Sequence, residues 1–269
     1  MSTQERTGID RIGDAFANAR GSAALMPYVM GGYPSIEASR LIGHACIAAG
    51  ADVIELGVPY SDPLADGPVI HEAGTRALAA GANLSGVLRV AESLAASVPV
   101  VLMCYANMVL APGVDAFLDR LARSGASGLI VPDLPLGETE EVLEACQQRG
   151  LALVPLIAPT TPPERLAAIG ARASGFLYVV SVVGTTGERE SSSEHLAGLL
   201  ARAKAATEVP VALGFGISTP EHVRRASQAG ADGVIIGTRL VRAAGEQTDP
   251  AGAVGATLSE LASGLFTDR

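Results

Sequence analysis

Short apolar runs without polar alternation recur along the chain, separated by stretches in which apolar residues repeat every three to four positions. Runs of this kind are typical of strands buried on both faces, and the stretches between them are typical of amphipathic helices. The pattern therefore predicts strands that alternate with helices. The eight predicted strands are Leu25–Val29, Val53–Leu56, Val100–Met103, Gly128–Val131, Ala152–Ile157, Phe176–Val180, Val209–Leu213 and Gly233–Ile236.

The helices between these strands end in a recognisable way. At three joints a glycine stands between two small residues, Gly50, Gly125 and Gly230. Glycine adopts the positive φ that a helix C-terminus often needs, so each predicts a helix end. Two helices are expected after the second strand. The predicted helices are Gly8–Ala19, Ile36–Ala49, Ile70–Ala80, Leu84–Ala96, Val114–Ser124, Glu138–Arg149, Pro163–Ile169, His195–Ala205 and Pro220–Ala229.

Eight strands alternating with helices over this length predict a single α/β domain, residues 1–269, folded as a closed (β/α)8 TIM barrel. An extra N-terminal helix could plug the floor of the barrel, and extra helices are expected in the loops after strands 2 and 8. An open doubly wound sheet is the alternative. It would usually carry GxGxxG after the first strand, and the segment from Met30 to Pro34 is not such a motif.

Composition narrows the function classes. The chain is 48% hydrophobic, 17% charged and has a net charge of −9, which disfavours nucleic acid as a partner. No apolar stretch is long enough to span a membrane, and no signal peptide is evident. Cys46, Cys104 and Cys146 match no zinc spacing, so thiols in a reducing, cytoplasmic environment are expected. The histidines form no metal-spaced pair, and no metal site is expected.

The chemistry of a barrel lies at the C-terminal ends of its strands. Glu55 stands there, and a loop rich in proline and aspartate follows it. Burial would raise the pKa of this carboxyl and suit it to proton transfer near neutral pH. A second carboxylate from the loop could share the acid and base work. Asp62 and Asp66 are both candidates, and either could equally be a turn former.

The last strands carry features of an anion site. Gly214 and Gly216 follow the seventh strand, and Gly237-Thr238 opens a helix whose N–H groups and dipole favour a phosphate. Tight turns alone would also explain these glycines. Tyr28, Tyr105 and Tyr178 fall on or just after strands, where they could line a pocket for a flat apolar substrate or simply pack in the core.

Lys204 is the only lysine, and its predicted helix position lies outside the barrel mouth. A Schiff-base aldolase needs a lysine in the pocket, so any carbon–carbon cleavage here must use general acid–base chemistry.

These residues resemble the tryptophan synthase α subunit family from about Leu25 to Leu261. The most specific element runs from Glu55 to Pro68, ELGVPYSDPLADGP, and weaker ones are YAN at Tyr105–Asn107, VPDLP at Val131–Pro135, GTTG at Gly184–Gly187 and GFGIS at Gly214–Ser218. The resemblance implies a lyase that cleaves indole-3-glycerol phosphate to indole and glyceraldehyde 3-phosphate, the α reaction of L-tryptophan biosynthesis.

The same resemblance assigns residue roles. It implies that Glu55 is the catalytic acid–base group and that Asp66, rather than Asp62, stabilises charge on the indole nitrogen. Segment 184–194 resembles the family's mobile lid. Residues implied to contact the indole, the glycerol or the phosphate of the substrate are Tyr28, Tyr105, Tyr178, Thr186, Gly187, Phe215, Gly216, Gly237 and Thr238.

The resemblance also implies a partner. The chain would dock on a tryptophan synthase β subunit in an α2β2 heterotetramer and would need no cofactor itself, with pyridoxal phosphate expected only in the β subunit. The expected docking residues are Pro59, Asp62, Pro63, Asn107 and Pro135. Two other hypotheses are a different phosphate-binding barrel enzyme, of the sugar-phosphate isomerase type, and a non-catalytic barrel that activates a partner. A second acid–base pair would favour the former, whereas the presence of both Glu55 and Asp66 argues against the latter.

Overall fold

The computed structural model describes residues 6–180, 193–214, 216–246 and 248–266. In these ranges, nine strand segments form one all-parallel sheet in the order β5-β4-β3-β2-β1-β9-β8-β7-β6. The segments are β1 (Ala24–Met30), β2 (Ile54–Gly57), β3 (Val100–Met103), β4 (Gly128–Ile130), β5 (Ala152–Val154), β6 (Leu156–Ile157), β7 (Leu177–Val180), β8 (Val211–Gly214) and β9 (Gly233–Ile236).

The sheet closes into the predicted eight-stranded barrel because β5 and β6 belong to one strand. β5 pairs with β4 and β6 pairs with β7, so the two ends of the strand order meet at Pro155. Proline has no N–H to donate to a ladder, which explains why the predicted strand Ala152–Ile157 is divided there. The Pro155 carbonyl still accepts a hydrogen bond from Tyr178 N–H at 3.0 Å.

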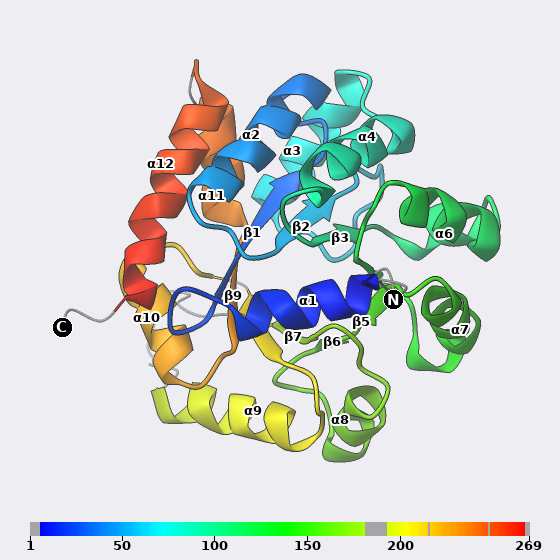
Figure 1. Ribbon diagram of the computed structural model, residues 1–269, viewed down its shortest axis with the longest axis vertical. Helices are drawn as coiled ribbons and strands as arrows, with labels where there is room; N and C mark the ends of the chain where they lie inside the picture. The colour runs from blue at the N-terminus through cyan, green and yellow to red at the C-terminus, as the bar shows by residue number, and fades with distance from the viewer. Residues whose placement is uncertain (1–5, 181–192, 215, 247, 267–269) are drawn as a thin grey trace, which may run out of the picture.

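Helices surround the barrel (Figure 1). The predicted helices and the extra ones after the second and last strands are confirmed, while α5 and the 3-10 turn η1 were not predicted. The helices are α1 (Gly8–Ala17), α2 (Ile36–Ala48), α3 (Pro68–Ala79), α4 (Leu84–Ala95), α5 (Ala106–Leu110), α6 (Val114–Arg123), η1 (Leu136–Glu138), α7 (Glu140–Gln148), α8 (Pro163–Gly170), α9 (Ser193–Ala205), α10 (Pro220–Gln228), α11 (Thr238–Glu246), α12 (Pro250–Ala262) and η2 (Ser263–Leu265).

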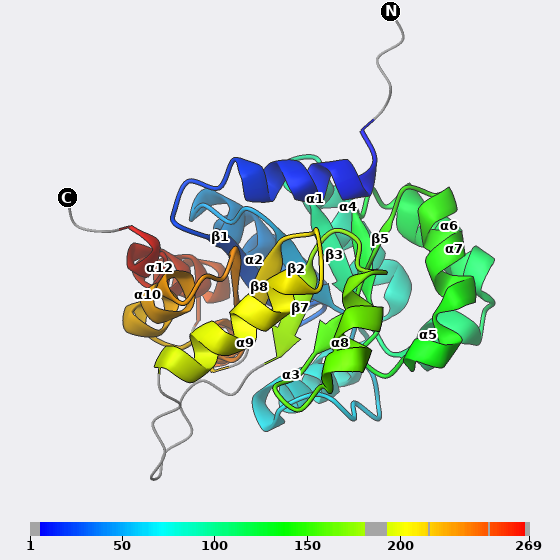
Figure 2. The ribbon, with the colours of Figure 1, turned by 90° about the horizontal axis from the view of Figure 1, so that it is seen from below.

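Helix α1 closes the floor of the barrel, as expected. Figure 2 shows it across the end of the barrel opposite to α3. Its Ile12 is fully buried in the inner core together with Met26 and Phe176. Arg11 fixes the helix from the outside, because its guanidinium donates to the Gly125 carbonyl at 3.0 Å and to carbonyls at the end of α4. The floor is therefore closed by apolar packing, and the opposite end remains for chemistry.

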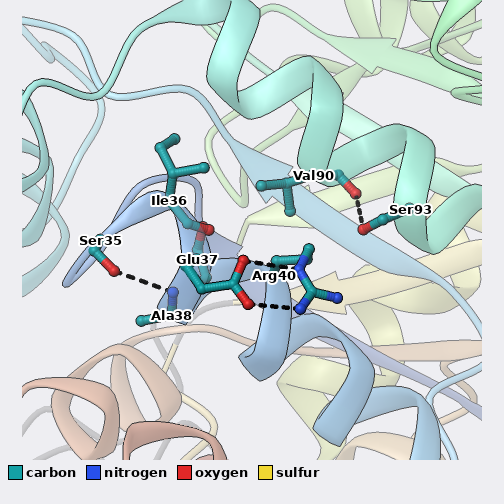
Figure 3. Close-up of polar contacts among 8 residues, drawn as sticks. Ser35, Ile36, Glu37, Ala38, Arg40, Val90 and Ser93 are labelled. Atoms are coloured by element: carbon teal, nitrogen blue, oxygen red, sulfur yellow. Dashed lines mark hydrogen bonds and ion pairs between the residues drawn. The ribbon is translucent and has the colours of Figure 1, made fainter.

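Local capping explains where the helices begin. At α2, the Ser35 hydroxyl accepts a hydrogen bond from Ala38 N–H at 3.1 Å, and Arg40 pairs with Glu37 one turn along the helix (Figure 3). Such a cap satisfies one of the free N–H groups of the first turn. Gly50, Gly125 and Gly230 have φ values of 95°, 72° and 102°, so the predicted glycine helix ends are confirmed.

Candidate active site

Glu55 lies on β2 inside the barrel, beside Tyr28 of β1 and Val101 of β3 in the strand register. The residue is 2% exposed, and its Oε2 has no hydrogen-bond partner among the described residues. Burial, and secondarily the charge of Asp66, raise the pKa of this carboxyl from its ordinary value of 4.5 to about 8. Glu55 is therefore a neutral acid at neutral pH, with an oxygen available to another molecule.

Asp66 approaches from the loop after β2 and is held by Tyr105. The Tyr105 hydroxyl donates to Asp66 Oδ1 at 2.9 Å and accepts from Ala65 N–H at 3.0 Å. Burial raises the pKa of Asp66, but the Tyr105 hydrogen bond and nearby His71 oppose that shift. The two carboxyls thus differ in environment: the buried one keeps its proton, and the hydrogen-bonded one releases it more readily.

Two buried tyrosines fill the barrel beside Glu55. Tyr28 and Tyr178 are 7% and 6% exposed, and burial together with the Glu55 carboxyl raises the pKa of both hydroxyls. Each ring requires a glycine on another strand, because a Cβ at Gly57 would overlap the Tyr28 hydroxyl and one at Gly214 would overlap the Tyr178 hydroxyl. Gly214 is therefore explained by packing inside the barrel rather than by close approach of an anion.

The candidate phosphate segments lie at the ends of β8 and β9. Gly216 is exposed and has a φ of 76°, a conformation that favours glycine. After β9, the Gly237 carbonyl accepts from Leu240 N–H at 2.9 Å and from Val241 N–H at 3.1 Å, and α11 begins at the exposed Thr238. The glycine turn after β8 and the N-terminus of α11 are therefore both exposed to solvent. They lie at neighbouring strand ends, because β8 pairs with β9, and an anion could contact both.

A cavity of about 380 Å³ opens elsewhere at the mouth, between the end of β4, the β5–β6 strand and the helices α7 and α8. Its walls include Val154, Leu156 and Val180, but neither Glu55 nor Asp66 lines it. The pair formed by buried Glu55 and half-buried Asp66 locates the candidate site better than this cavity does, because the pair can transfer a proton and stabilise charge.

Other predicted residues fall in different places. Thr186, Gly187, Phe215 and the lid segment 184–194, except its last residues 193–194, lie outside the described residues. Lys204 of α9 pairs with Asp232 at 2.7 Å, and the other oxygen of Asp232 accepts from the first residue of β8. The lysine therefore lies at the floor end, outside the mouth, as predicted.

The expected docking residues are mostly exposed. Asp62, Asn107 and Pro135 are exposed and Pro63 is half-buried, but Pro59 is buried beside Gly74 and offers no surface. Two apolar neighbours not named from the sequence are also exposed, Leu64 at 87% and Leu110 at 48%.

Sequence reasoning also missed two residues that place Tyr105. The Asp133 carboxylate accepts from Ala106 N–H at 2.8 Å and so fixes the start of α5 directly after Tyr105. Tyr60 stacks on the Tyr105 ring with centroids 5.2 Å apart. Asp133 stands in a motif noted above, but a hydrogen bond between residues 27 positions apart has no local signal.

The chain is similar to known proteins over most of its length. The family model for "Tryptophan synthase alpha chain" matches residues 15–266. The tryptophan synthase alpha chain of Carboxydothermus hydrogenoformans is 50% identical over 237 residues, 87% of this chain and 88% of that protein. That of Synechococcus elongatus is 47% identical over 240 residues, 88% and 90% of the two chains.

Solved structures are similar over nearly the whole chain. A chain of tryptophan synthase from M. tuberculosis superposes with a TM-score of 0.87 at 37% identity, covering 98% of this chain and 100% of that one. A chain of the tryptophan synthase a2b2 complex from Pyrococcus furiosus gives a TM-score of 0.83 at 37% identity, covering 90% and 98%. The extent of these matches shows that the chain belongs to the tryptophan synthase alpha chain family.

Proposed function

We propose that Glu55 and Asp66 are the catalytic residues of the α reaction of tryptophan synthase. As a member of its family, the chain is a carbon–carbon lyase of tryptophan biosynthesis that acts on indole-3-glycerol phosphate. One observation carries the assignment of the pair: Glu55 is a buried carboxyl at a barrel strand end, with a pKa of about 8 and an unpartnered oxygen, and a second carboxyl lies close enough to raise that pKa.

The reaction needs proton transfers at Glu55 and stabilisation of positive charge by Asp66. Neutral Glu55 gives its proton to indole C3, and the indole nitrogen then carries positive charge. The Asp66 carboxylate stabilises that charge, because it is held by Tyr105 and faces a site partly removed from water. The bond from C3 to the glycerol chain breaks, and its electrons return to the ring. The glycerol hydroxyl gives its proton to Glu55 as the aldehyde forms, which restores the acid.

The tyrosines and the strand ends hold the rest of the substrate. Tyr28 and Tyr178 give flat walls beside Glu55, suited to an indole ring. Gly216, Gly237 and Thr238 bind the phosphate through backbone N–H groups and the dipole of α11. Segment 184–194, with Thr186 and Gly187, and Phe215 would complete the contacts. Because Glu55 can supply the proton transfers and the indole ring can accept the electrons of the broken bond, the chain needs no cofactor.

The exposed rim of the mouth is the docking surface for a β subunit. Leu64, Leu110 and Pro135 expose apolar groups around Asp62 and Asn107, as a protein interface requires. The Pyrococcus furiosus structure is of an a2b2 complex, which supports an α2β2 assembly for this chain. The β subunit of that assembly would carry the pyridoxal phosphate that the family resemblance implies. No helix in the described part of the chain is long and apolar enough to cross a membrane. Three buried unpaired cysteines support a cytoplasmic location.

The decisive assay is indole release from indole-3-glycerol phosphate, with and without a β subunit. We expect indole from the purified chain and faster release in the complex. A correctly folded chain that releases no indole in either state would contradict the proposal.

The phosphate site has a separate test in hydrogen exchange: glycerol 3-phosphate should protect amides near Gly216 and Thr238, and indole should not. Equal protection by indole would place the phosphate elsewhere.

A further inference from the structure

His222 contacts the loop that joins β8 to α10. Its Nδ1 lies 3.1 Å from the Gly216 carbonyl oxygen, 3.3 Å from Ser218 Oγ and 3.4 Å from Ser218 N. The shortest contact is to a carbonyl, which can only accept, so Nδ1 carries a hydrogen and donates it. In this tautomer the Ser218 hydroxyl oxygen can accept from the same Nδ1–H, whereas a bond from Ser218 N–H would require the other tautomer. One side-chain nitrogen thereby contacts both ends of the turn Gly216–Ser218, through the Gly216 carbonyl and the Ser218 hydroxyl.

The helix that carries His222 is fixed. Its N-terminus is capped by Thr219, whose hydroxyl accepts from His222 N–H at 3.2 Å, and the next residue, Val223, is fully buried. Helix α10 also packs against η2. The imidazole is therefore held by a rigid element, and the turn is held by the imidazole.

The bond to Gly216 orients a peptide plane. In a trans peptide the C=O and N–H point in opposite directions, so fixing the Gly216 carbonyl toward His222 turns the Ile217 N–H away from it. Gly216 needs this support, because glycine with a positive φ has many other conformations available. Without the hydrogen bond, the turn would have to be ordered by the ligand, which costs binding free energy.

We propose that His222 is a positioning residue that holds the Gly216–Ser218 turn in its phosphate-binding conformation. The inference rests on the proposed phosphate site at Gly216. His222 does not touch the reacting atoms, so its effect falls on affinity for the phosphate group and leaves the chemical step unchanged.

Three variants test this assignment in the full-length chain. His222→Ala removes the donor, whereas His222→Asn places an amide nitrogen where Nδ1 lies. Arg225→Ala is the matched control, because Arg225 is an exposed residue of the same helix that pairs only with Glu221 among the described residues. The measurements are the Kd for glycerol 3-phosphate, the KM and kcat for indole-3-glycerol phosphate, and the melting temperature.

We expect His222→Ala to raise the Kd and the KM by about three- to tenfold, the effect of one lost hydrogen bond, with kcat unchanged within twofold. His222→Asn should restore most of the affinity, and Arg225→Ala should behave like the wild type. Unchanged affinity in His222→Ala, a loss confined to kcat, or an Asn variant as weak as Ala would overturn the role of His222.

Hydrogen exchange on the wild type separates the two proposals. If glycerol 3-phosphate protects Gly216–Ser218 but His222→Ala binds it with wild-type affinity, the phosphate site stands and the positioning role of His222 is contradicted. Absence of that protection in the wild type would contradict the phosphate site and the inference with it.

Discussion

The two ends of the barrel each bury a side-chain oxygen that has no hydrogen-bond partner among the described residues: Ser127 Oγ at the floor and Glu55 Oε2 at the mouth. The hydroxyl at the floor lies near the beginning of β4 and cannot titrate in the normal range. The carboxyl at the mouth has a pKa of about 8 and lies among tyrosines and a second carboxyl. An unmet polar group costs stability at either end, but only the one at the mouth can do chemistry.

The surroundings of the Ser127 hydroxyl are apolar, whereas those of the Glu55 carboxyl include polar groups. Ile12, Met26 and Phe176 fill the floor with apolar contacts. At the mouth, Tyr28 and Tyr178 bring hydroxyls into the barrel, and Gly57 and Gly214 make room for them. The floor therefore holds the strands rigidly, and this rigidity allows the mouth to keep a buried acid in place.

The largest effect is expected when the acid at the mouth is removed. Glu55→Gln keeps the shape of the side chain but cannot exchange a proton. Turnover should fall by at least about a hundredfold, and up to about ten-thousandfold, the range of general acid–base contributions. Steady-state indole release checks this, with circular dichroism as the control for folding. Turnover like that of the wild type would contradict the assignment of Glu55.

The pH dependence of stability tests the burial of Glu55 separately from its role in catalysis. In the unfolded chain Glu55 ionises above about pH 4.5, whereas in the folded chain it stays protonated until about pH 8. Ionisation therefore favours unfolding as pH rises through this window, and the protein loses on the order of 5 kcal/mol of stability above pH 8 relative to pH 4.5.

Glu55→Gln lacks this titration. Urea unfolding at pH 5, 7 and 8.5 should show the variant becoming progressively more stable than the wild type as pH rises. A stability difference that stays constant with pH would mean that Glu55 is not buried in its neutral form.

Asp66 should have a smaller effect, because it stabilises charge and transfers no proton. Asp66→Asn is expected to lower kcat by roughly ten- to hundredfold and to change KM little, because the positive charge on the indole nitrogen develops mainly in the transition state. Initial rates over a range of substrate concentrations separate the two constants. A raised KM with kcat intact would make Asp66 a ground-state binding residue.

The sequence predicts the barrel and the position of Glu55 because both follow from local pattern. A buried strand appears as an unbroken apolar run, and a carboxylate at its end is visible in the printed chain. The choice between Asp62 and Asp66 needed the family resemblance, since both residues suit a turn. The structure gives the physical distinction: Asp66 is half-buried and bonded to Tyr105, whereas Asp62 is exposed and bonded to the neighbouring Ser61.

Features that depend on distant contacts could not be predicted. Helix α5 is five residues long, and its first N–H is satisfied by Asp133 from another loop. A segment so short has little helical tendency of its own. The reason for Gly214 was missed in the same way, because the Tyr178 ring reaches it from the adjacent strand β7.

Gly214→Ala tests the packing of the mouth directly. The new methyl group would overlap the Tyr178 hydroxyl, so we expect a loss of about 1–3 kcal/mol in stability. Gly13→Ala on α1 is the matched change at the floor. A Cβ there meets open space, and alanine should stabilise the helix by roughly 0.5–1 kcal/mol. Thermal unfolding of both variants checks the contrast, and equal effects would contradict the packing described for Tyr178.

The smallest effect is expected at the hydroxyl of the floor. Ser127 is fully buried, and its Oγ has no partner among the described residues, so Ser127→Ala removes an unmet polar atom without opening a large cavity. Stability should rise by up to about 1 kcal/mol, because the cost of burying the hydroxyl disappears. Turnover should not change, since the residue lies at the opposite end from Glu55. Urea unfolding and indole release measure the two properties on the same sample. A loss of 1 kcal/mol or more would show that the Ser127 hydroxyl has a partner such as a bound water, and the two ends of the barrel would then differ in polar satisfaction as well as in chemistry.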